Sequence, residues 1–224
     1  MSPHLVRCVV TLLLAAGCDS REPLVGRSAP RSPSDPRTFE RPLTGDETRQ
    51  LAADPGVANR WYVTSAAADG FPIDAISRAP LTLLRYDGPA DDRVLAAIAG
   101  SATLQHINLT DYRGGAMGLK RLLEMPSLTG LRLVVASGDP PFQVPEDSSE
   151  VKSHAPSDVS RGAHLKSLHL IGWTVDAEAV AVIERMTKLQ SLYIDGGVLN
   201  AEALQSLLER RPRLHCHVDS LHLD

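Results

Sequence analysis

Apolar residues recur in a fixed register along most of this chain. The nine-residue phrase HLKSLHLIG, residues 164–172, returns 24 residues later as KLQSLYIDG, residues 188–196. Each copy has apolar residues at its second, fifth and seventh positions, and a polar or aromatic residue lies between the last two. Alternation over such a short run is typical of a half-buried β-strand. The pattern therefore predicts strands that follow one another at a regular interval.

The same three apolar columns continue toward the N-terminus. Their members are Ala58, Trp61 and Val63; Leu81, Leu84 and Tyr86; Leu104, Ile107 and Leu109; Leu128, Leu131 and Leu133; Leu165, Leu168 and Leu170; and Leu189, Leu192 and Ile194. The first column advances by 23, 23, 24, 37 and 24 residues. A register that holds through six copies indicates a repeated structural unit, because chance would not keep the columns aligned.

Helical patterns fill the intervals between the predicted strands. The segment NAEALQSLLERRP, 200–212, has an N-cap residue at Asn200, a leucine face and a proline at its end. The segment DAEAVAVIERMT, 176–187, begins in the same way at Asp176, and GLKRLLEMP, 118–126, also stops at a proline. A strand followed by a helix in each unit predicts a parallel sheet, because the crossover returns the chain to the same edge.

The form LxxLxL at this period resembles the leucine-rich repeat. The resemblance covers roughly Val57 to the C-terminus. It implies an α/β solenoid of about six repeats of 23–25 residues, with a curved parallel sheet on the concave face and helices on the convex face. The Asn often seen three positions after the third column is replaced here by Ala66, Pro89, Tyr112, Ala136, Trp173 and Gly197.

The first 42 residues follow a different pattern. Arg7 precedes an apolar run, 8–16, that is too short to cross about 30 Å of hydrocarbon, which predicts a signal peptide over 1–17. The sequence LLAAGC, 13–18, resembles the lipobox of bacterial lipoproteins, which implies cleavage before Cys18 and acylation of its thiol. The alternative is an ordinary cleaved signal with an incidental cysteine and a secreted, soluble product. The lipoprotein would lie in the bacterial cell envelope, at the inner or the outer membrane.

The remaining chain divides into a tether and one domain. Residues 18–42 are rich in Pro, Arg and Ser and cannot bury enough apolar surface to order themselves, so we expect a disordered tether. The repeat domain covers 43–224, with an N-terminal cap over 43–57 in which Thr44 and Glu47 have the spacing of a capping box. Within it we expect a surface insertion at about 137–164 and a C-terminal cap over 214–224.

Composition excludes several classes of function. The formal net charge of −4 argues against a nucleic-acid partner, which needs a clustered basic face. Of three cysteines, Cys8 leaves with the signal, Cys18 is acylated and Cys216 has no partner, so packing alone holds the fold. No GxSxG elbow, HExxH helix or Walker-type glycine loop is present. We therefore expect no catalytic residue and no cofactor.

The candidate site is the row of residues between the second and third columns. Because strand residues alternate sides, these residues face away from the core, on the concave face. The central row is Tyr62, Arg85, Asn108, Arg132, His169 and Tyr193, flanked by Arg60, His106, Ser167 and Ser191 on one side and by Asp87, Thr110 and Asp195 on the other. Tyrosine and arginine often dominate binding energy at interfaces, so we expect a protein or peptide partner. The alternative is a structural envelope component whose row is polar because it faces water.

The C-terminal phrase LHCHVDSLHLD, 214–224, leaves a metal-dependent enzyme as another alternative. It puts His215 and His217 on one side of a strand with Cys216 opposite, and Asp219 and His222 follow, a set that could bind zinc. The competing interpretation is a polar cap over the last apolar layer, in which His217 and Asp219 occupy column positions that have lost their apolar character. We favour the cap and predict no metal site.

Overall fold

The computed structural model describes residues 42–51, 53–54, 60–68, 70–135, 142, 162, 164–219 and 221–223. All of them belong to one compact unit, Ser32–Asp224. The expected signal peptide, Cys18, the tether apart from Pro42, and most of the expected insertion lie outside the described residues.

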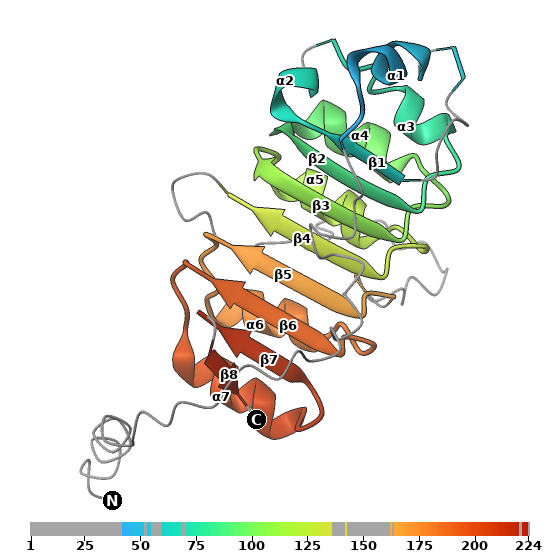
Figure 1. Ribbon diagram of the computed structural model, residues 1–224. Helices are drawn as coiled ribbons and strands as arrows, with labels where there is room; N and C mark the ends of the chain where they lie inside the picture. The colour runs from blue at the N-terminus through green and yellow to red at the C-terminus, as the bar shows by residue number, and fades with distance from the viewer. Residues whose placement is uncertain are drawn as a thin grey trace, which may run out of the picture. The chain divides into compact units, whose positions relative to one another are not determined.

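One sheet forms the centre of the described structure, and its strands follow one another in chain order (Figure 1). Strands β1 to β7 pair in parallel, whereas β8 runs antiparallel to β7. The strands are β1 (Arg60–Val63), β2 (Leu83–Ala90), β3 (His106–Tyr112), β4 (Gly130–Val134), β5 (Ser167–Ile171), β6 (Ser191–Asp195), β7 (His215–Val218) and β8 (Leu221–Leu223). The predicted α/β class with a parallel sheet is therefore confirmed.

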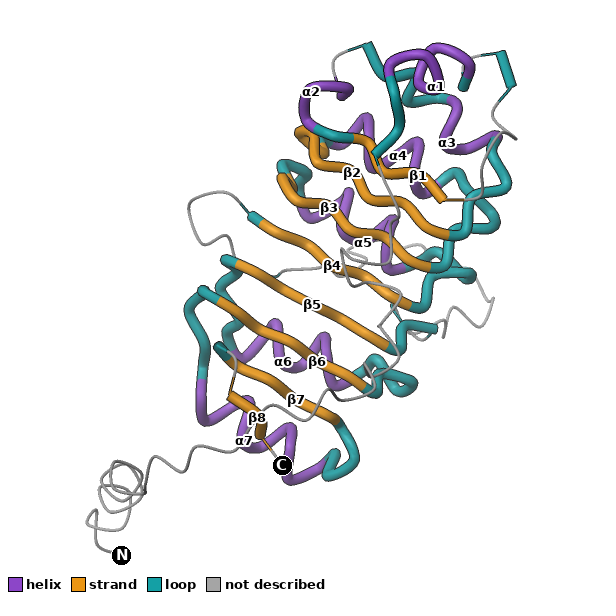
Figure 2. The backbone as a smooth tube through the Cα atoms, viewed as in Figure 1, coloured by secondary structure: helices purple, strands orange, loops and turns teal. Residues whose placement is uncertain are grey.

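Helices α4, α5, α6 and α7 lie together behind the sheet, whereas α1, α2 and α3 gather at the β1 end (Figures 1 and 2). The opposite side of the sheet from α4–α7 is called the front face below. The helices are α1 (Gly45–Gln50), α2 (Ser65–Ala68), α3 (Ala75–Arg78), α4 (Asp92–Ala99), α5 (Ala116–Leu123), α6 (Ala177–Glu184) and α7 (Ala201–Arg210).

Capping residues begin α1, α6 and α7 where the sequence predicts them. The Thr44 hydroxyl accepts a hydrogen bond from the Glu47 backbone N–H at 3.2 Å, and the Glu47 carboxylate accepts one from the Thr44 backbone N–H at 2.8 Å. Asp176 caps α6 and Asn200 caps α7 by accepting from the backbone N–H three residues on. The caps satisfy donors that the first helical turn leaves unpaired, which sets where each helix starts.

The apolar columns align across the sheet and form its buried side. The second column pairs in the order Trp61, Leu84, Ile107, Leu131, Leu168 and Leu192, and the third in the order Val63, Tyr86, Leu109, Leu133, Leu170 and Ile194. All twelve side chains are buried against residues of the helices such as Leu95, Leu119, Val180 and Leu207. Ala58, the first member of the first column, lies outside the described residues.

The register at β7 differs from the expected one by one residue. The structure pairs Cys216 with Leu192, so Cys216 and Val218 take the column positions expected for His217 and Asp219. Cys216 is buried and behaves as a small apolar residue, and its burial raises the pKa of its thiol to about 11. A shift of one residue reverses the side of every side chain on a strand. His217 therefore lies on the front face.

The expected insertion also contributes to the core. Phe142 is buried, its backbone N–H donates to the Thr174 carbonyl at 2.9 Å, and its ring meets Trp173 edge-on at 5.6 Å. The Gly162 backbone N–H donates to the Leu123 carbonyl at 2.8 Å. At these two residues the chain packs on the domain, which differs from the surface excursion that the sequence suggests.

Candidate functional site

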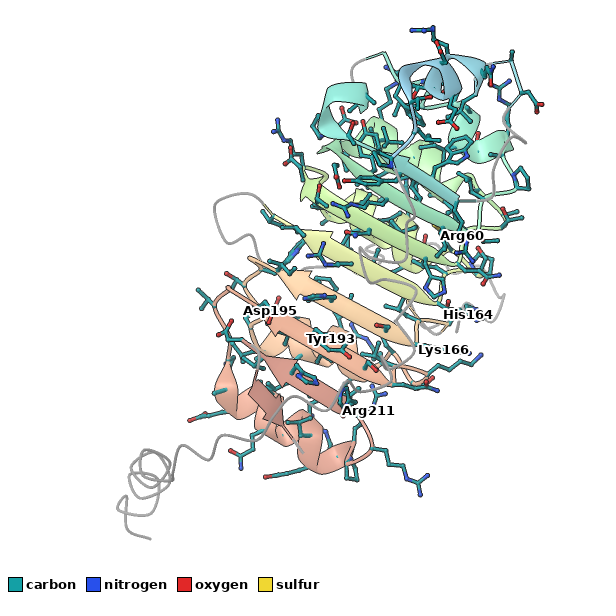
Figure 3. The ribbon with its side chains drawn as sticks, in the orientation of Figure 1. Arg60, His164, Lys166, Tyr193, Asp195 and Arg211 are labelled. Carbon is teal, nitrogen blue, oxygen red and sulfur yellow. The ribbon has the colours of Figure 1, made fainter. Side chains whose placement is uncertain are left out.

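The front face carries the six predicted row residues side by side. Tyr62 pairs with Arg85, Arg85 with Asn108, Asn108 with Arg132, Arg132 with His169, and His169 with Tyr193. The row continues to His217, which pairs with Tyr193. Sequence reasoning missed His217 because it placed β7 one residue out of register. These seven residues are called the central row below, and Figure 3 shows Tyr193 within it.

The β1 end of the central row is held by a network around Asp87. Arg85 donates to both oxygens of the Asp87 carboxylate, from Nε at 2.9 Å and from Nη2 at 3.1 Å, and Thr110 adds a third hydrogen bond at 3.1 Å. The Arg85 guanidinium also lies 4.2 Å from the centre of the Tyr62 ring. Burial and the bonded Asp87 carboxylate raise the pKa of Tyr62, so the phenol stays neutral at physiological pH. This end is a rigid, preformed surface.

The middle of the central row differs from the prediction. The Asn108 side chain is only 2% exposed, so the free protein does not present it as the open surface contact that the sequence suggests. It is short and lies between the longer side chains of Arg85 and Arg132. Arg132 donates from Nη1 to Asn108 Oδ1 at 2.9 Å. Burial, and then the charge of Arg85, lower the pKa of Arg132, which still remains far above neutrality.

The β7 end of the central row is aromatic. The Tyr193 ring stacks on His217 at 5.0 Å with 17° between the planes, and it lies 5.4 Å from His169. His169 donates from Nε2 to the Asp195 carboxylate at 2.7 Å. Burial lowers the pKa of His169, and the Asp195 hydrogen bond opposes that effect without cancelling it. The lowered pKa favours the uncharged form of His169 within this stack.

The two flanking rows occur where predicted. Arg60, His106, Ser167 and Ser191 lie in one register row that also includes Leu83, Gly130 and His215. On the other side, Asp87 and Thr110 are joined by their hydrogen bond, and Asp195 binds His169. Burial lowers the pKa of His106, which is half-buried in its row.

The histidine pair at β7 does not extend to a metal site within the described residues. His215 and His217 bring their Nε2 atoms to 2.8 Å. Asp219 instead accepts a hydrogen bond from the Gly196 backbone N–H at 2.7 Å. In the part of the chain that is described, no group of three or more His, Cys, Asp or Glu side chains could hold a metal ion. His222 pairs with His217 in the backbone register, and its side chain lies outside the described atoms.

A basic groove that sequence reasoning missed lies at the edge of the sheet where the strands begin. It encloses about 500 Å³ and is lined by Lys166, Thr187, Lys188, Leu189, Gln190, Arg211, Pro212, Arg213 and Leu214. Figure 3 shows Lys166 and Arg211 at this edge. Arg211 stabilises the fold, because its guanidinium donates hydrogen bonds to the carbonyls of Met186 at 3.1 Å and Leu189 at 2.5 Å. The groove is lined by residues that precede three different strands. The sequence pattern of one repeat therefore does not predict it.

No protein-family model matches the chain, and a search of curated proteins finds no similar sequence. No helix among the described residues combines the length and the apolar character needed to span a bilayer.

Proposed function

We propose that this chain is a non-enzymatic binding module that recruits a peptide segment of a partner protein along the central row. The observation that carries the proposal is the continuous register that places two tyrosines, two arginines, one asparagine and two histidines on neighbouring strands of the front face. Tyrosine and arginine supply large contact areas with defined hydrogen bonds. Ion pairs and ring stacking hold these side chains in place before a partner arrives, which lowers the entropy cost of binding.

The dimensions of the central row suit an extended peptide. Seven neighbouring strands at 4.7–4.9 Å spacing give a row of about 29 Å. An extended chain advances about 3.3 Å per residue, so about nine residues would cover the row. A peptide of this length would contact the ion-paired end, the buried middle and the aromatic end together.

We further propose that the fold is a leucine-rich-repeat solenoid of about six units, carried by a bacterial lipoprotein anchor. Support for the solenoid comes from the LxxLxL columns and their spacing of 23 or 24 residues at four of five steps. Support for the anchor is the LLAAGC motif, which would place an acylated Cys18 at the membrane. The binding module would then work within the cell envelope.

Selection of peptides tests the proposed function. Phage-displayed random nonapeptides are panned on the immobilised full chain, and the affinity of the enriched peptides is measured by fluorescence anisotropy. We expect the Tyr193→Ala variant to lose at least about tenfold in affinity, since it removes an aromatic anchor.

A matched control is Met117→Ala, which truncates a 51% exposed apolar side chain on α5, away from the front face. This control should bind as the wild type does. The proposal is wrong if the wild type enriches no peptide, or if Tyr193→Ala and Met117→Ala affect binding equally.

A further inference from the structure

We infer that Arg132 and Asn108 form a carboxylate-binding point that takes an aspartate or glutamate side chain of the bound peptide. The inference rests on the proposed function, and it names the chemistry of the partner at the middle of the central row.

The first step is that Arg132 has hydrogen-bond donors to spare. A guanidinium carries five N–H donors. In the described structure Arg132 makes one hydrogen bond, from Nη1 to Asn108, and no ion pair. The two acids whose charges act on Arg132 are already engaged, because Asp87 binds Arg85 and Asp195 accepts from His169. Among the described residues, Arg132 is therefore the arginine of the central row that has donors left for a ligand.

The second step is the unpaired amide of Asn108. Its Nδ2 is buried and has no hydrogen-bond acceptor among the described residues. Rotating the amide by 180° would not help, because Oδ1 accepts from Arg132 and the rotation would set two donors against each other. A buried donor without an acceptor costs free energy, and natural structures seldom keep one without a reason. An acceptor atom brought by a ligand would remove that cost.

The third step is the match between these donors and a carboxylate. An ionised carboxylate only accepts hydrogen bonds, and its two oxygens fit the planar fork of a guanidinium. A peptide carboxylate bound to Arg132 would also offer a lone pair to Asn108 Nδ2. A peptide lysine or arginine would be repelled by Arg132 and by Arg85, whose charge already lowers the pKa of Arg132.

The spacing of the central row adds a second peptide position. Arg132 and Tyr193 are separated by two strand intervals, which is about 10 Å. An extended peptide covers that distance in about three residues. We therefore expect an acidic residue and, three positions along, an aromatic or apolar residue that packs on Tyr193 and His217.

The decisive variant is Asn108→Asp, which puts a carboxylate beside Arg132 within the protein itself. The variant keeps the oxygen that accepts from Arg132 and replaces the unpaired NH₂ group of Asn108 with a second oxygen. The new carboxylate should therefore take the place that a peptide carboxylate would have beside Arg132. Peptides enriched on the wild-type full chain are synthesised with Glu or with Gln at their acidic position. On the wild type we expect the Gln form to bind at least about tenfold more weakly, and on Asn108→Asp we expect that preference to vanish.

Asn200→Asp is the matched control, because the same exchange at the N-cap of α7 keeps a good capping residue and lies outside the central row. This control should retain the wild-type preference for Glu. Arg132→Gln is the second variant, and it should also bind the Glu and Gln forms equally. Thermal unfolding followed by circular dichroism verifies that each variant is folded.

The outcomes separate this inference from the proposed function. Peptides that depend on Tyr193 but show no preference for Glu over Gln would overturn the carboxylate site and leave peptide binding intact. A preference for Glu that survives both Asn108→Asp and Arg132→Gln would overturn it too, since the acid would then bind elsewhere. If no peptide is enriched on the wild type, both proposals fail.

Discussion

Most charged residues of the front face already have a hydrogen-bond partner on the same face. Asp87 accepts hydrogen bonds from Arg85 and Thr110, and Asp195 accepts one from His169. At the scale of single residues, these pairs flank the hydrogen bond between Arg132 and Asn108. Among the described residues of this face, Asn108 Nδ2 and His106 Nδ1 are buried without a hydrogen-bond partner.

The protonation of His169 gives a first prediction. Burial lowers the pKa of His169, whereas Asp195 raises it through a hydrogen bond and through its charge. In the Asp195→Asn variant the raising effects weaken, so the His169 pKa should fall further below its ordinary value near 6.5. Titration of the imidazole carbon-bound protons by NMR measures this pKa directly. A pKa that rises in the variant would contradict the contact.

The sign of the pH effect on stability follows from the same shift. Because the folded pKa of His169 lies below the unfolded one, the unfolded state takes up the proton first as the pH falls. The contribution of neutral His169 is therefore complete above about pH 6.5 and declines as the pH falls through that value. Urea unfolding of the wild type should show a lower free energy of unfolding at pH 5.5 than at pH 7.5, with a smaller difference in His169→Gln.

At the scale of the elements, turns and insertions set how closely neighbouring units approach. The turn after β6 contains Gly196 and Gly197. A Cβ atom on Gly197 would come within 2.0 Å of the Trp173 carbonyl oxygen, whereas one on Gly196 would meet nothing within 4 Å. Gly196 instead has a φ of +61°, which disfavours other residues.

The two glycines form a matched pair for mutation. Gly197→Ala should lower the free energy of unfolding by about 1–3 kcal/mol. The new Cβ atom would clash with the Trp173 carbonyl, and a backbone carbonyl cannot move aside as a side chain can. Gly196→Ala should cost about 1–2 kcal/mol from its left-handed φ alone. Chemical denaturation of both variants gives the comparison, and the contact is disproved if Gly197→Ala is the milder change.

Truncating Phe142 tests whether its side chain belongs to the core. Its ring is fully buried against Trp173, which itself packs on Tyr112 at 5.2 Å. Phe142→Ala should lower the free energy of unfolding by about 3–5 kcal/mol, as expected for a large buried aromatic side chain. A loss below about 1 kcal/mol in urea denaturation would instead indicate a surface segment.

The sequence predicts the elements of this molecule better than the contacts between them. Period-two columns reveal β1 to β6 because each core residue repeats in every unit. A lone buried aromatic such as Phe142 has no period and so gives no signal. The burial of Asn108 depends on arginines from two other strands. At β7 the column residue Cys216 stands between two histidines and is not recognisable as apolar from the sequence pattern. This explains why the predicted register of β7 is wrong by one residue.

At the scale of the whole molecule, the proposed anchor gives a prediction about the N-terminus. If Cys18 is acylated, cells that express the full chain and are grown with radiolabelled palmitate should incorporate label into it. Cys18→Ala should abolish the label and leave the protein uncleaved, whereas Cys216→Ala should keep it. Label that persists in Cys18→Ala would remove the anchor from the proposal.

The antiparallel strand β8 has a consequence for how copies of this chain meet. A parallel sheet leaves an edge of backbone donors and acceptors to which a second copy could add its own strand. At one end, β8 pairs with β7, and at the other the Leu43 N–H donates to the Tyr62 carbonyl at 2.8 Å beside β1. Deleting residues 220–224 would uncover the β7 edge. Because the β1 end stays covered, two uncovered β7 edges can only pair with each other, so sedimentation velocity should then show a dimer that grows with concentration and that β8 prevents in the intact chain.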